Sequence, residues 1–136
     1  MRIKSTETNK SIFIVFLILY FTMKSTWATG FNQTEGRVYY FDFDIQRITG
    51  IPEHQIEQYG CLYMINKIEF EKLIVENQEG RIKYNKNDIR GKVVFSGNDP
   101  YFISVGGVVR QGVNFSTIRK KDFVDLLSPI KEQKCR

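Results

Sequence analysis

The sequence predicts an α+β domain with a mainly antiparallel sheet and two or three short helices packed on one face of it, preceded by an N-terminal signal peptide. Short runs of alternating apolar and polar residues, separated by glycine, asparagine and proline, indicate strands joined by hairpins. Two other segments place apolar residues at helical spacing behind residues that favour a helix start. Sheet and short helices in one chain define the α+β class.

A secretory signal peptide is predicted over residues 1–28. Arg2, Lys4 and Lys10 precede ten consecutive apolar or aromatic residues at 12–21, and small residues follow up to Ala28. A basic start, a short apolar middle and a small-residue end are the three parts of such a signal. As a helix, the apolar run covers about 15 Å, roughly half of a bilayer core. One alternative is an uncleaved anchor, which would bury Lys24 in lipid. The other is a buried helix of a cytosolic protein.

Cleavage after Ala28 leaves 108 residues, enough for one domain with a single core. We expect residues 29–36 to be a linker and residues 37–136 to be that domain. The net charge is +5 for the whole chain and +2 after cleavage, since four of the basic residues and one acid lie in the signal. A nearly neutral exported domain gives no reason to expect nucleic-acid binding.

Both cysteines, Cys61 and Cys135, remain after cleavage. In an oxidising compartment a pair of cysteines most simply forms a disulfide, which would tie the C-terminal tail to the domain. The alternative is two free thiols.

The first strand is expected over residues 37–45. Its alternation places Tyr39, Phe41, Phe43 and Ile45 on one face, and the other face carries Asp42 and Asp44. A short helix beginning near Pro52 and ending at Gly60 follows.

Residues 61–65 predict a strand that runs into a helix over residues 67–77. Asn66 and Glu69 resemble a capping pair at its start. Phe70, Leu73 and Ile74 form its apolar stripe, which we expect to pack on the sheet.

The following residues predict an antiparallel meander. It comprises a turn at 85–88, a strand at 92–96, a loop containing Asn98, and extended runs at 101–105 and 108–112 joined by a hairpin at Gly106-Gly107. The final unit repeats an earlier one, because residues 118–127 align with residues 65–74 and match Phe123 to Phe70. Duplication and independent convergence on one strand-to-helix pattern both explain this similarity.

No catalytic, cofactor or metal motif is recognisable. The single histidine, His54, lies beside Glu53 and Glu57 and is interpreted as a surface residue. We therefore expect a protein that is not an enzyme and that needs no cofactor.

Charge is distributed unevenly along the chain, with a balance of −4 over residues 53–79 and +7 over residues 81–121. Such asymmetry can steer a charged partner. The residues we expect to contact a protein partner are Glu53, Glu57, Asn98, Asp99, Arg110, Arg119 and Lys120.

Export, one small domain and the absence of a catalytic motif lead to the hypothesis of a periplasmic or secreted binding protein. In this hypothesis it neutralises a toxin or a cell-wall hydrolase by occlusion, as immunity and inhibitor proteins do. One alternative is a membrane-anchored structural or accessory component of an envelope assembly. Another is a binder of anionic glycan, lipid or nucleic acid through the basic residues of 81–92 and 119–121.

Overall fold

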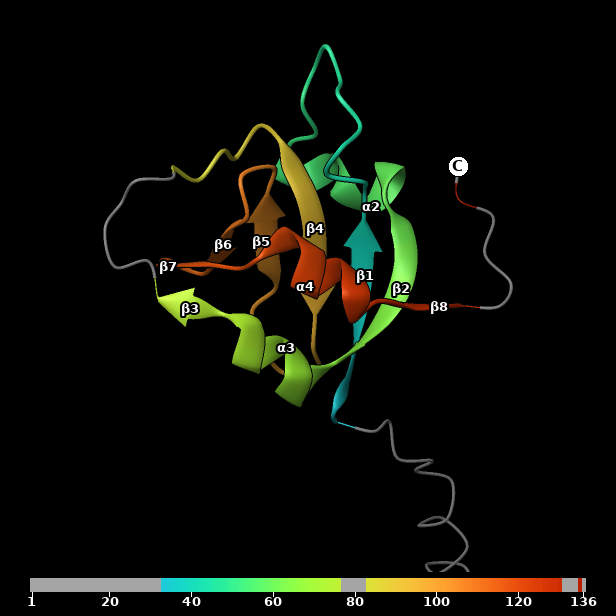
Figure 1. Ribbon diagram of the computed structural model, residues 1–136, viewed down its shortest axis with the longest axis vertical. Helices are drawn as coiled ribbons and strands as arrows, with labels where there is room; N and C mark the ends of the chain where they lie inside the picture. The colour runs from blue at the N-terminus through green and yellow to red at the C-terminus, as the bar shows by residue number, and fades with distance from the viewer. Residues whose placement is uncertain (1–32, 77–82, 131–134, 136) are drawn as a thin grey trace, which may run out of the picture. The chain divides into compact units, whose positions relative to one another are not determined.

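Eight antiparallel strands form one sheet in the order β3-β7-β6-β5-β4-β1-β2-β8 in the computed structural model (Figure 1). The structure describes residues 33–76, 83–130 and 135. The predicted signal peptide and residues 29–32 of the predicted linker therefore lie outside the described residues. The strands are β1 (Glu35–Tyr40), β2 (Cys61–Asn66), β3 (Val75–Glu76), β4 (Ile89–Val94), β5 (Tyr101–Ser104), β6 (Val108–Gln111), β7 (Asn114–Thr117) and β8 (Ser128–Pro129).

The described helices are all short: the 3-10 helix η1 (Glu53–Gln55), α2 (Ile56–Tyr59), α3 (Lys67–Leu73) and α4 (Lys120–Asp125). The α+β class and the antiparallel sheet are thus confirmed. The predicted cap of α3 is also present, because the Asn66 side-chain oxygen accepts a hydrogen bond of 3.1 Å from the Glu69 amide.

The main core lies between the sheet and helices α3 and α4, which cross the same face of the sheet (Figure 1). Phe70 of α3 and Phe123 of α4 are both fully buried, and their ring centroids are 6.1 Å apart. We call this side of the sheet the α3/α4 face. Its strand residues include Val38, Val93, Tyr101, Ile103 and Val109.

A smaller core lies on the opposite side of the sheet, which we call the α2 face. Ile56 of α2 packs there with Ile51 and Ile89, against Tyr39 and Phe102. The prediction that all helices share one face is therefore wrong for α2. The physical reason is that β1 and β5 carry large apolar or aromatic side chains on both of their faces. The α2 face must therefore also be shielded from water.

The first strand ends at Tyr40, so the predicted alternation through residue 45 is wrong beyond that point. The Asp42 side chain accepts a hydrogen bond of 2.9 Å from the Asp44 amide, which forms a turn. This turn sends Phe43 into the α3/α4 core and leaves Ile45 48% exposed.

Arg90 fixes the loop that follows this turn. It is only 2% exposed, and its Nη1 donates to the carbonyl oxygens of Asp42 at 2.8 Å and Ile45 at 2.7 Å. Its Nε and Nη2 donate to the carboxylate of Asp88. A buried guanidinium is tolerated here because its donors are satisfied.

The predicted meander is confirmed, and it extends by one hairpin to β7. Gln111 pairs with Asn114 across a two-residue turn in which Gly112 has a φ of +58°. Glycine is favoured at this first turn position because a side chain there would be strained.

The two repeated segments form equivalent units at an offset of 53 residues, measured from Val75 to Ser128. The same offset relates the first residues of β2 and β7 and those of α3 and α4. β8 pairs with β2 in the register that β3 uses with β7: Tyr63 faces Pro129, as Ser116 faces Glu76. Helix α3 thus leads from β2 to β3, which pairs with β7, and helix α4 leads from β7 to β8, which pairs with β2.

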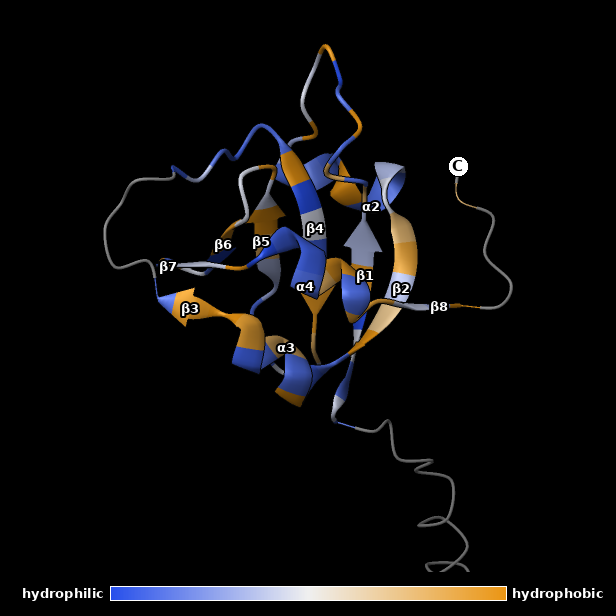
Figure 2. Ribbon diagram, viewed as in Figure 1, coloured by the Kyte–Doolittle hydropathy of each residue, from blue (hydrophilic) through white to orange (hydrophobic). Residues whose placement is uncertain are grey.

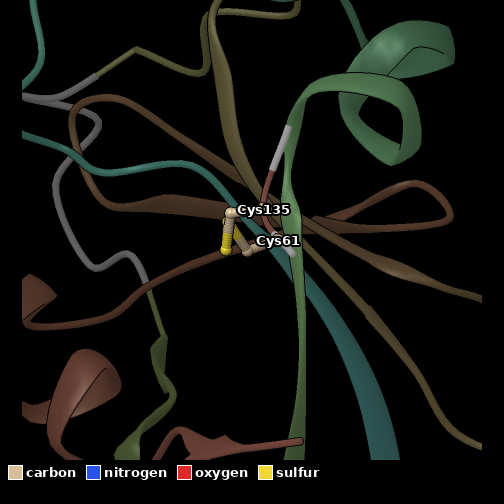
Figure 3. The surroundings of a disulfide bond; sticks show 2 residues. All are labelled: Cys61 and Cys135. Atoms are coloured by element: carbon tan, nitrogen blue, oxygen red, sulfur yellow. A yellow bond between two sulfur atoms is a disulfide. The ribbon is translucent and has the colours of Figure 1, made fainter. Parts of the chain in front are cut away.

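A disulfide joins Cys61, at the start of β2, to Cys135, as predicted (Figure 3). The two Cα atoms are 5.0 Å apart and are separated by 74 residues in the sequence. The bond ties the C-terminal end to the β2 side of the sheet.

Removing the ring of Phe123 should strongly destabilise the domain, because the ring contacts Tyr40, Phe43 and Phe70 in the main core. The Phe123→Ala variant is expected to lose about 3 to 5 kcal/mol of unfolding free energy in urea denaturation. Ile68→Ala, at a site 54% exposed on α3, is the control and should change it by less than about 0.5 kcal/mol. Similar losses in both variants would contradict the assigned core.

The disulfide should stabilise the domain mainly by restricting the unfolded chain. The double variant Cys61→Ser/Cys135→Ser is expected to lose about 4 kcal/mol of unfolding free energy, since the bond closes a loop of 74 residues. Urea denaturation should give the same loss for the native chain in the presence of a dithiol reductant. A reductant effect that persists in the double variant would show that the loss has another origin.

Candidate functional site

The seven residues predicted to contact a partner lie in three separate places. Glu53, Glu57 and Arg110 are on the α2 face, Asn98 and Asp99 are in the loop between β4 and β5, and Arg119 and Lys120 are at the start of α4. The structure therefore does not bring all seven together into one surface. Their contact with a partner stays a prediction, but their own surroundings can be described.

On the α2 face the predicted acidic and basic residues pair with each other. Arg110 donates to both carboxylate oxygens of Glu53, at 2.9 and 2.7 Å, and Lys92 Nζ lies 2.5 Å from a Glu57 oxygen. The Tyr84 hydroxyl also donates to Glu53, at 2.5 Å. The opposite charges of residues 53–79 and 81–121 thus partly neutralise each other within the fold.

Basic side chains and aromatic rings alternate in a row across the α2 face of the sheet. Phe102 of β5 is flanked by Lys92 Nζ at 5.5 Å and by the Arg110 guanidinium at 5.0 Å from its ring centroid. Lys92, Phe102 and Arg110 are direct cross-strand neighbours, and Phe115 of β7 faces Arg110. Cations over ring faces contribute attraction in addition to the ion pairs. This row fastens η1 and α2 to the sheet.

Arg119 and Lys120 also have partners within the domain. Arg119 Nε lies 2.6 Å from Asp122, although the arginine side chain is 88% exposed. Lys120 Nζ donates to the Val105 carbonyl at 3.4 Å and lies 5.6 Å from the Phe43 ring centroid. Lys120 thereby holds the Gly106-Gly107 hairpin near α4, at the opposite end of β5 and β6 from Asn98.

Asn98 and Asp99 belong to a hollowed surface at the other end of the hairpins. One open hollow is lined by Gly97, Asn98, Asp99, Gln111, Gly112, Val113 and Asn114. A second, open on the α3/α4 face, is lined by Glu71, Ile74, Glu76, Tyr101, Gln111, Asn114, Phe115 and Ser116. The hollows share Gln111 and Asn114, so we treat their lining residues as one site, the hairpin surface.

Large apolar side chains are exposed around the hairpin surface. Val113 at the tip of the β6–β7 turn is 88% exposed, and Phe115 on β7 is 49% exposed. Val75 of the neighbouring strand β3 is 58% exposed, and the hydrophobic colour reaches this edge of the sheet in Figure 2. Apolar residues that gather at one exposed end mark a surface suited to protein contact.

The hairpin surface is held by side chains from both sides of the sheet. Arg110, fixed by Glu53, donates a hydrogen bond of 2.8 Å to the Gly112 carbonyl. Gln111 Nε2 donates to the Asp99 carbonyl at 3.2 Å, which joins the two loops. The turn is therefore presented on an ordered support, which lowers the entropic cost of binding.

Sequence reasoning found Asn98 and Asp99 but missed Gln111, Val113 and Phe115. The segment Gln-Gly-Val-Asn between two extended runs is a hairpin signal that could have located the β6–β7 turn. Its proximity to Asp99 and Glu71 depends on strand order, which local patterns do not give.

No family model, curated protein or solved structure matches this chain. Among the residues that the structure describes, no group of three or more His, Cys, Asp or Glu side chains is arranged to hold a metal ion. Within the same residues, no helix is long and apolar enough to cross a membrane. The site must therefore be interpreted from its own geometry.

The hydroxyl of Tyr84 provides a test of the paired α2 face. Burial, and next the hydrogen bond to Glu53, raise the pKa of Tyr84 above its usual value. The folded state thus keeps its proton where the unfolded chain releases it, so the stabilisation is complete below about pH 10 and declines as the pH rises further.

The Tyr84→Phe variant should therefore lose unfolding free energy less steeply than the native chain between about pH 10 and 11.5. Part of the slope should remain, because burial also raises the pKa of Tyr40 and of Tyr101. Urea denaturation at each pH measures the slope, and Tyr59→Phe, at a site 36% exposed on α2, is the control. An unchanged slope in Tyr84→Phe would contradict the assignment.

Proposed function

We propose that the chain is a small exported binding protein that acts by covering part of another protein's surface. The observation that supports this most is the hairpin surface, where Val113 and Phe115 are exposed beside two polar hollows. A protein partner would bury these apolar groups and pair with the polar rim, the usual organisation of such interfaces. The action would be occlusion, which requires no chemistry from this chain.

The target class that fits this proposal is a toxin or a cell-wall hydrolase in the compartment to which the chain is exported. The Cys61–Cys135 disulfide is of a kind that forms and persists in oxidising compartments, which supports export. A projecting turn supported by Arg110 and Gln111 is suited to entering a concave site on such an enzyme.

Several of the predicted contact residues also form ion pairs within the domain. Glu53, Glu57 and Arg110 are used to hold η1 and α2 on the sheet, so their substitution would first alter the fold. The proposal therefore places the energetically important contacts at the hairpin surface, where Asn98 and Asp99 form part of the rim.

The proposal is tested by purifying the chain from its own host through a tag placed after Arg136 and identifying what it retains. We expect a form that begins at Thr29, with the disulfide intact, bound to one protein in equal amount, whose hydrolytic or toxic activity the chain suppresses. The Val113→Asp/Phe115→Asp variant should lose this complex, because charged groups cannot replace the buried apolar side chains. Ile68→Asp, an equally polar change on the exposed side of α3, should retain it.

Two results would overturn the proposal. One is a complex that forms equally well with the hairpin variant. The other is an uncleaved chain that needs detergent for extraction and holds several partners without suppressing any activity, which would favour an anchored component of an envelope assembly.

A further inference from the structure

We propose that the β3–β7 edge beside the hairpin surface binds an extended partner segment in which basic and apolar side chains alternate. This inference rests on the proposed function, because it names the chemistry of the partner at the same site. Its basis is the different character of the two faces of this edge.

Apolar side chains occupy the α2 face of the edge. Phe115 faces Arg110 across the β6–β7 ladder, and its ring lies 5.5 Å from the Tyr84 ring. Two residues further along β7, Thr117 faces Val75 of β3. Because alternate residues of a strand share a face, Phe115 and Val75 lie on the same side of the edge.

Acidic side chains occupy the other face. Glu76 pairs with Ser116 and follows Val75 directly in β3. Because neighbouring residues of a strand point to opposite faces, Glu76 projects to the α3/α4 face. There it lines the second hollow with Glu71 of α3, and Asp99 lines the first. Lys67 lies 3.9 Å from Glu71, but that glutamate side chain remains 48% exposed.

Among the residues that the structure describes, no basic residue lines either hollow. A partner with Lys or Arg side chains is therefore attracted, whereas nucleic acid or an anionic lipid surface is repelled. A second copy of this chain is also disfavoured, since the twofold contact of this edge with itself would bring Glu71 and Glu76 towards their own counterparts.

An extended segment satisfies both faces at once. Its alternate side chains point to opposite sides, so a basic–apolar alternation would direct cations to Glu71 and Glu76 and apolar groups to Phe115 and Val75. A helical partner presents one face only and cannot match this arrangement as well.

The two edges of the sheet differ at equivalent positions, and this difference favours the β7 side as the binding edge. On the β2 side, Cys61 is bonded to Cys135, which holds the C-terminal end there. The equivalent residue of β7 is Asn114, which is exposed and lines both hollows.

The test uses the oxidised full chain, labelled with ¹⁵N, and a blocked hexapeptide of alternating lysine and valine as the probe. The peptide should shift the amide signals of Val75, Glu76, Phe115 and Ser116 in a saturable manner. Two further peptides are compared: one of alternating glutamate and valine, and one with three lysines followed by three valines. Both should bind more weakly, because the first has the wrong charge and the second the wrong period.

The Glu71→Lys/Glu76→Lys variant should weaken binding of the lysine–valine peptide by about tenfold or more, since two attractions become repulsions. Glu35→Lys/Asp125→Lys makes the same change in net charge at exposed sites elsewhere and should bind like the native chain. Equal binding of the three peptides, shifts confined to other regions, or equal effects of the two variants would overturn the inference. So would concentration-dependent self-association through the same amides.

The inference and the proposed function can fail separately. If the host partner is lost on changing Val113 and Phe115 but no peptide binds the β3–β7 edge, the binding function stands and the alternating segment is wrong. If the peptide binds as described and no host partner is retained, the edge is a peptide site and the proposed function is wrong.

Discussion

The contact between Phe70 and Phe123 is the interaction on which most of this structure depends. The two rings meet where α3 and α4 pass over the same face of the sheet, and both are fully buried. Only if both helices pack there can β3 reach β7 and β8 reach β2 at opposite edges. One aromatic cluster therefore supports the core, the two crossover connections and the short strands at both edges.

Because the two units are equivalent in register, their differences indicate which parts of the surface are specialised. At the β2 edge the chain uses a disulfide, and at the β7 edge it exposes Asn114 and Phe115 instead. Exposed sheet edges favour pairing with other chains and are usually protected. An edge with apolar groups on one face and carboxylates on the other is selective, since it repels copies of itself.

The charged residues of the α2 face have a structural use that a list of charges would not suggest. Glu53 and Arg110 hold η1 on the sheet, and Arg110 also binds the carbonyl of the turn at Gly112. The β6–β7 turn is thus held in place by an ion pair on the α2 face of the sheet. The Arg90 guanidinium has a comparable role in the loop after β1, where it satisfies two backbone carbonyls.

The amino-acid sequence was sufficient to predict the α+β class, the Asn66 cap, the meander turns, the Cys61–Cys135 pair and the similarity of the two strand-to-helix segments. These depend on interactions between residues close in the chain, or on there being only two cysteines to pair. Three features became visible only in the folded domain: the end of β1 at Tyr40, the position of α2 on the opposite face, and the pairing of Glu53 with Arg110. The tertiary structure also brought Asp99, Glu71 and Phe115 to one surface, because side chains from three different segments meet only after the strand order is established.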